Sequence, residues 1–181
     1  MSKKLDLGCG NRKREGAIGI DCNPKTCADV IHDLNVFPYP FEDSSFDEIY
    51  ADNVLEHLGD LIKVLEELYR ISKPNAIIRV DVPYFRAKWA FIDPTHKHFF
   101  TTGSFSYYDP EHIHNRLFPY SNAKFKVEKI VFNERIKEKG FFGVIKRIVK
   151  KIANRSPQKY EDHISHFMPL DELTFYMKVV K

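Results

Sequence analysis

A short glycine loop, residues 8–10, follows an apolar run near the start of the chain. The preceding residues, 4–7, have the pattern of a buried strand, and Gly8 and Gly10 flank Cys9. A strand that ends in Gly-x-Gly lets a ligand come close to the backbone, because no side chain stands in the way. In open parallel sheets, ligands lie beyond the carboxyl ends of the strands. The loop alone is equally consistent with a tight turn that binds nothing.

The residues after the loop disfavour a dinucleotide site. Such a site has a third glycine, a helix that binds the pyrophosphate, and an acid about 20 residues further on. Here Asn11, Arg12 and Lys13 follow the loop, and Asp21 is only 13 residues past Gly8. Too few residues remain before the next strand to form a helix with a phosphate-binding N-terminus. The pattern disfavours NAD and FAD but allows a nucleoside cofactor without phosphate.

Acidic residues end or follow the next three predicted strands, at Asp21, Asp33 and Asp52. The carboxylate of Asp21 can accept hydrogen bonds from both hydroxyls of a ribose, and Asp33 can meet an adenine amino group. Any one of these acids could be a cap or turn residue. Several carboxylates facing one cleft, however, suit a cationic ligand such as a sulfonium.

Histidines and aromatic residues supply candidates for catalysis and for acceptor binding. His57 is the candidate general base if its turn of helix lines the cleft; packing against the neighbouring loop is its alternative role. Beyond the fifth predicted strand, Tyr84, His96 and His98 are assigned to the substrate, with Trp89 as a possible apolar wall.

No metal site is predicted. Asp93, His96 and His98 are residue types that ligate metals, but exposed loop histidines are the commoner outcome. Cys22 and Cys27 lack a second Cys or His pair with zinc spacing. The three cysteines are too few, and odd in number, for a disulfide framework, so we expect reduced thiols in a cytoplasmic protein.

Strand and helix patterns alternate over the first half of the chain, which favours a parallel sheet covered by helices. One helix is clear: apolar residues between Leu58 and Tyr69 recur at helical spacing, and Asp60 is its expected N-cap. A long connection before the last strand suggests an antiparallel end to the sheet. The expected strands are 4–7, 17–20, 29–32, 46–51, 76–82, 125–132 and 173–180.

Two segments depart from this alternation within one expected domain, 1–181. Residues 84–123 are rich in aromatic residues, His and Pro, and are interpreted as an excursion on the substrate side. Residues 134–172 are interpreted as a basic insertion before the last strand. Within it, 134–155 hold eight Lys or Arg against two Glu, so the rest of the chain carries a net charge of −3.

The basic insertion is expected to contain an amphipathic helix over residues 140–154. Its apolar stripe runs through Phe141, Ile145, Ile148 and Ile152. Three roles stay open: packing on the domain with a solvated basic face, contact with an anionic membrane or lipid-linked substrate, and nucleic-acid binding, the least favoured. We therefore expect a cytoplasmic protein, with peripheral membrane contact as an alternative; no stretch of 18 apolar residues could span a bilayer.

Motifs across residues 5–83 resemble class I S-adenosylmethionine-dependent methyltransferases, of the type 11-like, short glycine-loop kind. They occur in the order and spacing of that family, which is far more specific than any one motif. The matching pieces are LDLGCG at 5–10, Asp21, Asp33 with Leu34, FPYPFEDSSFD at 37–47, VLEHL at 54–58 and LYRISKPN at 68–75.

The resemblance implies a doubly wound, Rossmann-like α/β sheet of about seven strands, mostly parallel with an antiparallel last strand. The helix that usually connects the first two strands is missing, so Arg12 or Lys13 is expected to hold the methionine carboxylate. S-adenosylmethionine is the implied cofactor. The residues assigned to it are Gly8, Cys9, Gly10, Arg12, Asp21, Cys22, Asp33, Leu34 and Asn53.

The predicted function is methyl transfer from S-adenosylmethionine to a small-molecule or glycan-type acceptor. DPTH at 93–96 and FMPL at 167–170 resemble a subset of these enzymes associated with surface-glycan pathways. Two alternatives remain: a binding protein that has the cofactor fold without catalysis, and an RNA methyltransferase.

Overall fold

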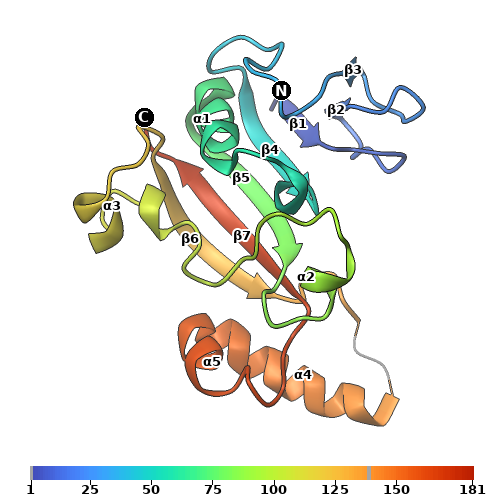
Figure 1. Ribbon diagram of the computed structural model, residues 1–181, viewed down its shortest axis with the longest axis vertical. Helices are drawn as coiled ribbons and strands as arrows, with labels where there is room; N and C mark the ends of the chain where they lie inside the picture. The colour runs from blue at the N-terminus through green and yellow to red at the C-terminus, as the bar shows by residue number, and fades with distance from the viewer. Residues whose placement is uncertain (1, 138–139) are drawn as a thin grey trace.

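The computed structural model describes residues 2–137 and 140–181, and a seven-stranded sheet forms the centre of this part of the chain (Figure 1). The strand order is β3-β2-β1-β4-β5-β7-β6. Strands β1 to β5 pair in parallel, whereas β7 is antiparallel to both of its neighbours. The predicted mixed sheet is confirmed. The strands are β1 (Lys4–Leu7), β2 (Ala17–Asp21), β3 (Val30–Ile31), β4 (Phe46–Asp52), β5 (Ser72–Pro83), β6 (Phe125–Phe132) and β7 (Glu172–Val179).

The middle of the sheet forms the hydrophobic core. Leu5, Ile49 and Ile78 are fully buried, as is Phe175 on β7. Strands that are covered on both faces need apolar residues at successive positions, and β5 meets this need with an almost continuous buried run toward its carboxyl end. Burial of this kind fixes the positions of the loops at the carboxyl edge of the sheet.

The predicted helix between β4 and β5 is α1 (Leu61–Ile71), and it begins as expected after Asp60. The Asp60 carboxylate accepts a hydrogen bond from the backbone N–H of Lys63 at 3.0 Å, which satisfies one of the free donors of the first turn. The face that turns toward the sheet includes Val64, Leu65 and Leu68, all fully buried. The remaining helices are η1 (Leu55–His57), α2 (Trp89–Ile92), η2 (Ser106–Tyr108), α3 (Ile113–Leu117), α4 (Gly140–Arg155) and α5 (Pro157–His163).

The connection between β1 and β2 has no helix, as predicted, and the connections from β2 to β3 and from β3 to β4 also lack one. The side of the sheet formed by β1, β2 and β3 is therefore covered by fewer helices than the doubly wound pattern implies. Side chains bonded to backbone amides hold these short connections in place. Asp29 accepts from the N–H of Gly19 at 2.7 Å, and Asp21 accepts from Gly10 and Asn23, both at 2.9 Å.

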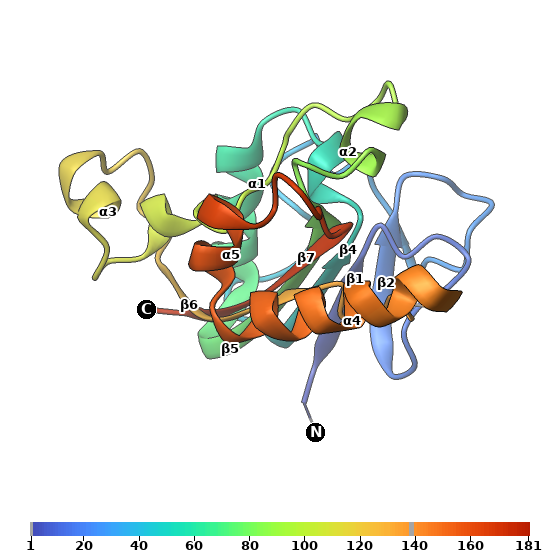
Figure 2. The same ribbon diagram turned by 90° about the horizontal axis from the view of Figure 1, so that it is seen from below.

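Helices α4 and α5 lie side by side near the carboxyl end of β6 (Figures 1 and 2). The Asn154 carboxamide oxygen accepts a hydrogen bond from the backbone N–H of Phe132, the last residue of β6. The predicted helix over 140–154 is thus present. None of the helices in the described ranges, 2–137 and 140–181, is long and apolar enough to cross a membrane.

The apolar stripe predicted for α4 faces outward. Ile145, Ile148 and Ile152 are 38%, 58% and 46% exposed, whereas Val149 and Ala153 are buried. The helix packs inward through these smaller residues, so the large isoleucines are left at the surface. The side chain of Phe141, the other member of the predicted stripe, lies outside the described part of the protein.

Candidate functional site

Three cavities adjoin at the carboxyl edge of the sheet, and Asn53, directly after β4, lines all of them. The β2–β3 cavity encloses about 260 Å³, the glycine-loop cavity about 350 Å³ and the α2 cavity about 410 Å³. Asn53 adopts a left-handed backbone conformation, with φ of 53°. Asparagine tolerates this region better than most residues, and strain of this kind is often found at functional sites.

Every residue predicted to bind the cofactor lines one or both of the first two cavities. The β2–β3 cavity contains Gly8, Asp21, Cys22, Asp33, Leu34 and Asn53, together with Asn35, Val54, His57 and Leu58. The glycine-loop cavity contains Gly8, Cys9, Gly10, Arg12 and Asn53, together with Asp6, Asn11, Asp52 and Arg135.

The two loop glycines have different roles. Both have positive φ, 56° at Gly8 and 51° at Gly10. A Cβ atom at Gly8 would lie 2.6 Å from Cγ2 of Val54, whereas a Cβ at Gly10 would meet nothing within 4 Å. The close packing of Val54, together with the positive φ, therefore favours glycine at position 8 whether or not a ligand is bound. At Gly10 a side chain would enter open space.

The carboxylates of the β2–β3 cavity are held in place by backbone amides. The two oxygens of Asp21 each accept one hydrogen bond, from Gly10 and from Asn23. Asp33 accepts from the backbone and side-chain nitrogens of Asn35, both at 2.9 Å, and these bonds lower the pKa of the Asp33 carboxyl. Each carboxylate keeps acceptor capacity for a ligand, because an ionised carboxyl group has about four lone-pair sites.

The glycine-loop cavity brings together charges of both signs. Arg135 pairs with Asp52 at 2.8 Å and also contacts the buried Asp81. Arg79, beneath them, pairs with Asp52 at 2.6 Å. A zwitterionic group, with one ammonium and one carboxylate, fits such a lining better than a purely anionic one.

Of the two basic residues predicted to hold a ligand carboxylate, Arg12 lines the cavity and is exposed. Lys13 instead pairs with Asp29 at 2.7 Å, and the neighbouring Arg14 pairs with Asp52. No ion pair of Arg12 is found within 2–137 and 140–181, so its guanidinium is available to a ligand.

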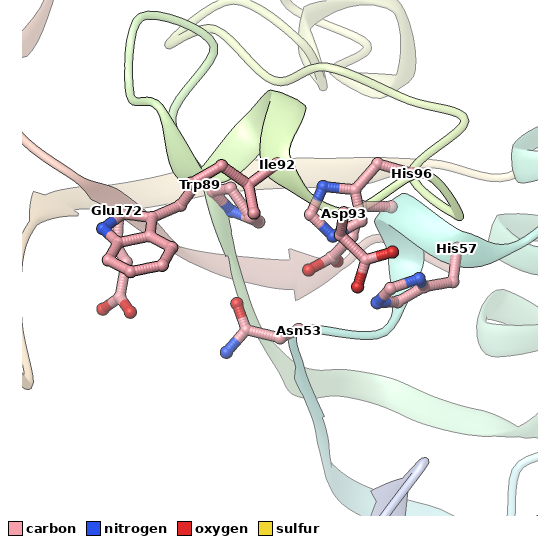
Figure 3. A pocket seen from close by; sticks show the side chains of 9 residues that line it. Asn53, His57, Trp89, Ile92, Asp93, His96 and Glu172 are labelled. Carbon is pink, nitrogen blue, oxygen red and sulfur yellow. The ribbon is translucent and has the colours of Figure 1, made fainter.

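Asn53 and His57 are among the side chains that line the α2 cavity (Figure 3). His57 also lines the β2–β3 cavity, so it stands where the two cavities meet. Its ring lies 4.7 Å from that of His96, centroid to centroid. Burial, together with the neighbouring His96, lowers the pKa of His57 and favours the neutral imidazole. The lining consists of Asn53, Glu56, His57, Pro83, Trp89, Ile92, Asp93, His96 and Glu172.

Two glutamates of the α2 cavity were not found from the sequence. Glu56 is 1% exposed, and neither carboxylate oxygen has a hydrogen-bond partner among the described residues. Burial and neighbouring carboxylates raise the pKa of Glu56 to about 7. Burial likewise raises the pKa of Glu172, and one of its oxygens is also without a described partner. A buried polar group without a partner is costly, so these side chains mark a place where a ligand can bind.

The structure brings His96 to the α2 cavity but not the other two residues assigned to the substrate. Tyr84 is fully buried, and its ring contacts Phe85, Phe132 and Tyr160 in the core. His98 does not line the cavity, because its Nε2 atom is bonded to the backbone oxygen of Leu58 at 2.9 Å. His96 and His98 lie in a loop, and only His96 is among the residues that line the cavity.

Some site residues could have been found from the predicted topology. Arg135 follows β6, and Glu172 begins the antiparallel β7, so both lie at the carboxyl edge of the parallel strands. Glu56 precedes the predicted catalytic His57, but the direction in which the Glu56 side chain points depends on the short helix η1 (Leu55–His57). Local sequence does not determine that direction.

Comparisons with known proteins agree with this geometry. The sequence family described as "Methyltransferase domain" matches residues 5–80, and no curated protein sequence matches the chain. An S-adenosylmethionine-dependent methyltransferase from Archaeoglobus fulgidus is 21% identical, with a TM-score of 0.58 over 98% of this chain and 86% of that chain. A second from Thermotoga maritima, described as a possible histamine N-methyltransferase, is 14% identical, with a TM-score of 0.57 over 100% and 83%. The [4+2]-cyclase SpnF is 14% identical, with a TM-score of 0.59 over 99% and 75%.

The chain therefore has the class I methyltransferase fold, and its residues 5–80 resemble the methyltransferase-domain sequence family. A protein named as a cyclase shares the fold. The fold does not by itself identify the acceptor.

Proposed function

We propose that this protein is an S-adenosylmethionine-dependent methyltransferase that acts on a small-molecule or glycan-type acceptor bound in the α2 cavity. The observation that carries the proposal is that Asn53 and His57 line both the α2 cavity and the β2–β3 cavity. A methyl group held on the cofactor side can meet an acceptor only where two such cavities join.

The residues of the first two cavities fit the parts of the cofactor. Asp21 would accept from the ribose hydroxyls, Asp33 and Leu34 would contact the adenine, and Arg12 would bind the methionine carboxylate. When bound, S-adenosylmethionine supplies an electrophilic methyl group on a sulfonium. The carboxylates around these cavities suit that positive charge.

His57 is the candidate to act on the acceptor. Its Nδ1 atom lies 2.8 Å from Oγ1 of Thr95, and Thr95 in turn donates its hydroxyl hydrogen to Asp93 at 2.6 Å. Because the hydroxyl hydrogen is used in this way, Nδ1 of His57 carries the proton and Nε2 keeps its lone pair. A neutral imidazole with a free Nε2 can accept a proton from an acceptor hydroxyl or position it for attack.

The lining of the α2 cavity suits a hydroxylated acceptor. Trp89 and Ile92 provide apolar surface, and Asp93, His96 and Glu172 provide polar groups. Pockets of this composition use a few polar side chains to orient a ligand against apolar walls. Sugars and small hydroxylated molecules offer both kinds of surface.

A methyl-transfer assay tests the proposed function. The protein is incubated with S-adenosylmethionine labelled in its methyl group and with separate fractions of small molecules, glycans and RNA. Label in a small-molecule or glycan fraction is the expected result, and it should be lost in His57→Ala. Label in RNA alone would replace the proposal with an RNA methyltransferase. Cofactor binding without transfer to any fraction would favour a binding protein.

We also propose that α4 makes peripheral contact with an anionic membrane or a lipid-linked acceptor. The observation that favours this contact is the outward ridge of Ile145, Ile148 and Ile152, next to the exposed Arg147 and Lys151. Apolar residues flanked by cations are typical of helices that lie on anionic membranes.

A further inference from the structure

Three side chains in the α2 cavity present possible metal-ligand atoms to one another. A carboxylate oxygen of Glu56, a ring nitrogen of His57 and a ring nitrogen of His96 all lie within 4.8 Å of one another. Donor atoms that share one ion at about 2.0–2.2 Å lie roughly 3–3.5 Å apart. Modest side-chain rotations would therefore allow all three to bind the same ion.

In both histidines, the Nδ1 atom is already engaged in a hydrogen bond. In His96, Nδ1 lies 3.0 Å from the backbone oxygen of Ala90 and must donate to it. In His57, Nδ1 donates to Oγ1 of Thr95, as described above. In the neutral form of either ring, Nε2 is therefore the nitrogen with the free lone pair. Histidines that bind metals are typically held in this way, with the other ring N–H donated to a carbonyl or to a polar side chain.

Glu56 provides an independent indication of a ligand. Its side chain lines the cavity, is 1% exposed, and leaves both carboxylate oxygens without a hydrogen-bond partner among the described residues. Asp93 and Glu172 line the same cavity, so two further carboxylates are close by. Buried carboxylates are normally paired or bound to a metal.

We propose that Glu56, His57 and His96 bind a divalent transition-metal ion of the Zn²⁺ type. Two imidazoles and one carboxylate form an established ligand set for such ions, with positions left open for substrate or water. This inference deepens the proposed function and rests on it for its role, because the three side chains line the cavity assigned to the acceptor.

The ion would define the class of acceptor as an oxygen nucleophile. A hydroxyl bound to a divalent ion loses its proton to solvent water more readily, since the ion lowers its pKa. An acceptor with a second oxygen next to that hydroxyl, as in a vicinal diol, could occupy two open positions. His57 would then act on the acceptor through the ion rather than as a proton acceptor.

Metal binding can be measured without any acceptor. Zn²⁺ is titrated into the full-length protein by calorimetry, and Co²⁺ is followed by its visible absorption. We expect one ion per chain, bound at least 10-fold more weakly in Glu56→Gln and in His96→Ala, since even partners outside the ligand shell cost 10- to 100-fold. His163→Ala is the matched control, because it removes an exposed histidine on α5.

The cysteines are the competing ligands, because Cys22 and Cys27 are exposed free thiols. The double variant Cys22→Ser/Cys27→Ser should bind Zn²⁺ as the wild type does, and the Co²⁺ spectrum should lack thiolate charge-transfer bands. Binding that persists in His96→Ala and Glu56→Gln, or that disappears only with the cysteines, would overturn the proposal. Thermal unfolding of each variant confirms that it is folded before titration.

A parallel titration with S-adenosylhomocysteine separates this inference from the proposed function. If only the metal proposal is wrong, the protein binds S-adenosylhomocysteine but does not bind Zn²⁺. Failure of the proposed function would appear as a protein that binds Zn²⁺ at these residues but neither binds S-adenosylhomocysteine nor transfers a methyl group. The metal site itself would stand in that second case, but its role toward an acceptor would not.

Discussion

Asp21 has a structural role and a proposed binding role at the edge of the sheet, which mutation can separate. Its carboxylate fixes the glycine loop through Gly10 and lines the β2–β3 cavity. Asp29 fixes the same region through Gly19 and Lys13 but lines neither cofactor cavity. The two acids therefore form a matched pair, one with a structural role and a proposed binding role and one with a structural role alone.

Asp21→Ala should weaken the binding of S-adenosylhomocysteine by about 1.5–3 kcal/mol, the usual value for hydrogen bonds to a charged group. Calorimetric titration measures the change. Asp29→Ala should lower the melting temperature by a similar amount as Asp21→Ala but leave the affinity nearly unchanged. Equal losses of affinity in both variants would mean that Asp21 acts only by holding the loop.

Gly10→Asn tests whether the space beside the loop belongs to the cofactor. Asparagine tolerates the positive φ of Gly10, and its side chain would enter space that is open in the structure. The variant should fold and lose most of its affinity for S-adenosylhomocysteine. The control is Gly16→Asn, at φ of 72° and also with no atom near its Cβ, and outside the cofactor cavities. Normal binding by a folded Gly10→Asn would remove the glycine-loop cavity from the cofactor site.

At the scale of elements, α1 holds the long connection between β3 and β4. Glu67 accepts from the backbone N–H of Tyr39 at 2.7 Å and forms two bonds with Arg70, at 2.8 and 2.7 Å. Burial alone would raise the pKa of Glu67, but the hydrogen bonds from Arg70 and Tyr39 outweigh it and lower the pKa. The connection therefore depends on an ionised carboxylate.

Glu67→Gln should lower the free energy of unfolding at pH 7 by about 1–3 kcal/mol. Because the pKa is lower in the folded state, the stabilisation is present above the unfolded pKa, near 4.5, and is lost as the pH falls through the folded value. Urea unfolding at several pH values should show that the difference in free energy of unfolding between wild type and variant disappears below about pH 4.5. Glu128→Gln, at an exposed position on β6, should show no such difference. A difference that does not change with pH would contradict the charge-based account.

The exposed face of α4 leads to a prediction about membranes. Lys146 and Lys150 are tied to Asp171 and to the backbone oxygen of Asn133, whereas Arg147 and Lys151 are exposed and form no ion pair among the described residues. Each should contribute about 1 kcal/mol near an anionic surface, so Arg147→Gln/Lys151→Gln should bind anionic vesicles roughly 30-fold more weakly. Vesicle sedimentation at low salt measures this, with Lys25→Gln/Lys63→Gln as the control. Wild-type protein that ignores anionic vesicles would contradict membrane contact.

At the scale of the whole molecule, the residues that line the proposed cofactor cavities were predictable from the sequence, and those that line the proposed acceptor cavity were not. Residues such as Gly8, Asp21 and Asp33 directly follow strands, and parallel strands bring their carboxyl ends to one edge. The acceptor side depends on residues 84–100 folding back over that edge. The sequence assigned both His96 and Tyr84 to the substrate; His96 does line the α2 cavity, whereas Tyr84 packs in the aromatic core.

The same reasoning explains why Glu56 was missed. Sequence position places it next to His57 without showing that its carboxylate would be buried without a partner. The apolar stripe of α4 was similarly predictable from the sequence, but whether it faces the domain or the solvent was not. A helix docks by the face that fits its neighbours, and here Val149 and Ala153 fit better than the larger isoleucines.

The central claim is that the cavities around Asn53 form a working cofactor site. Calorimetric titration of the wild-type protein with S-adenosylmethionine and with S-adenosylhomocysteine tests it most directly. We expect one molecule of either compound to bind per chain, with micromolar affinity for S-adenosylhomocysteine and a loss of that affinity in Asp21→Ala. No detectable binding of either compound to a folded protein would contradict the claim.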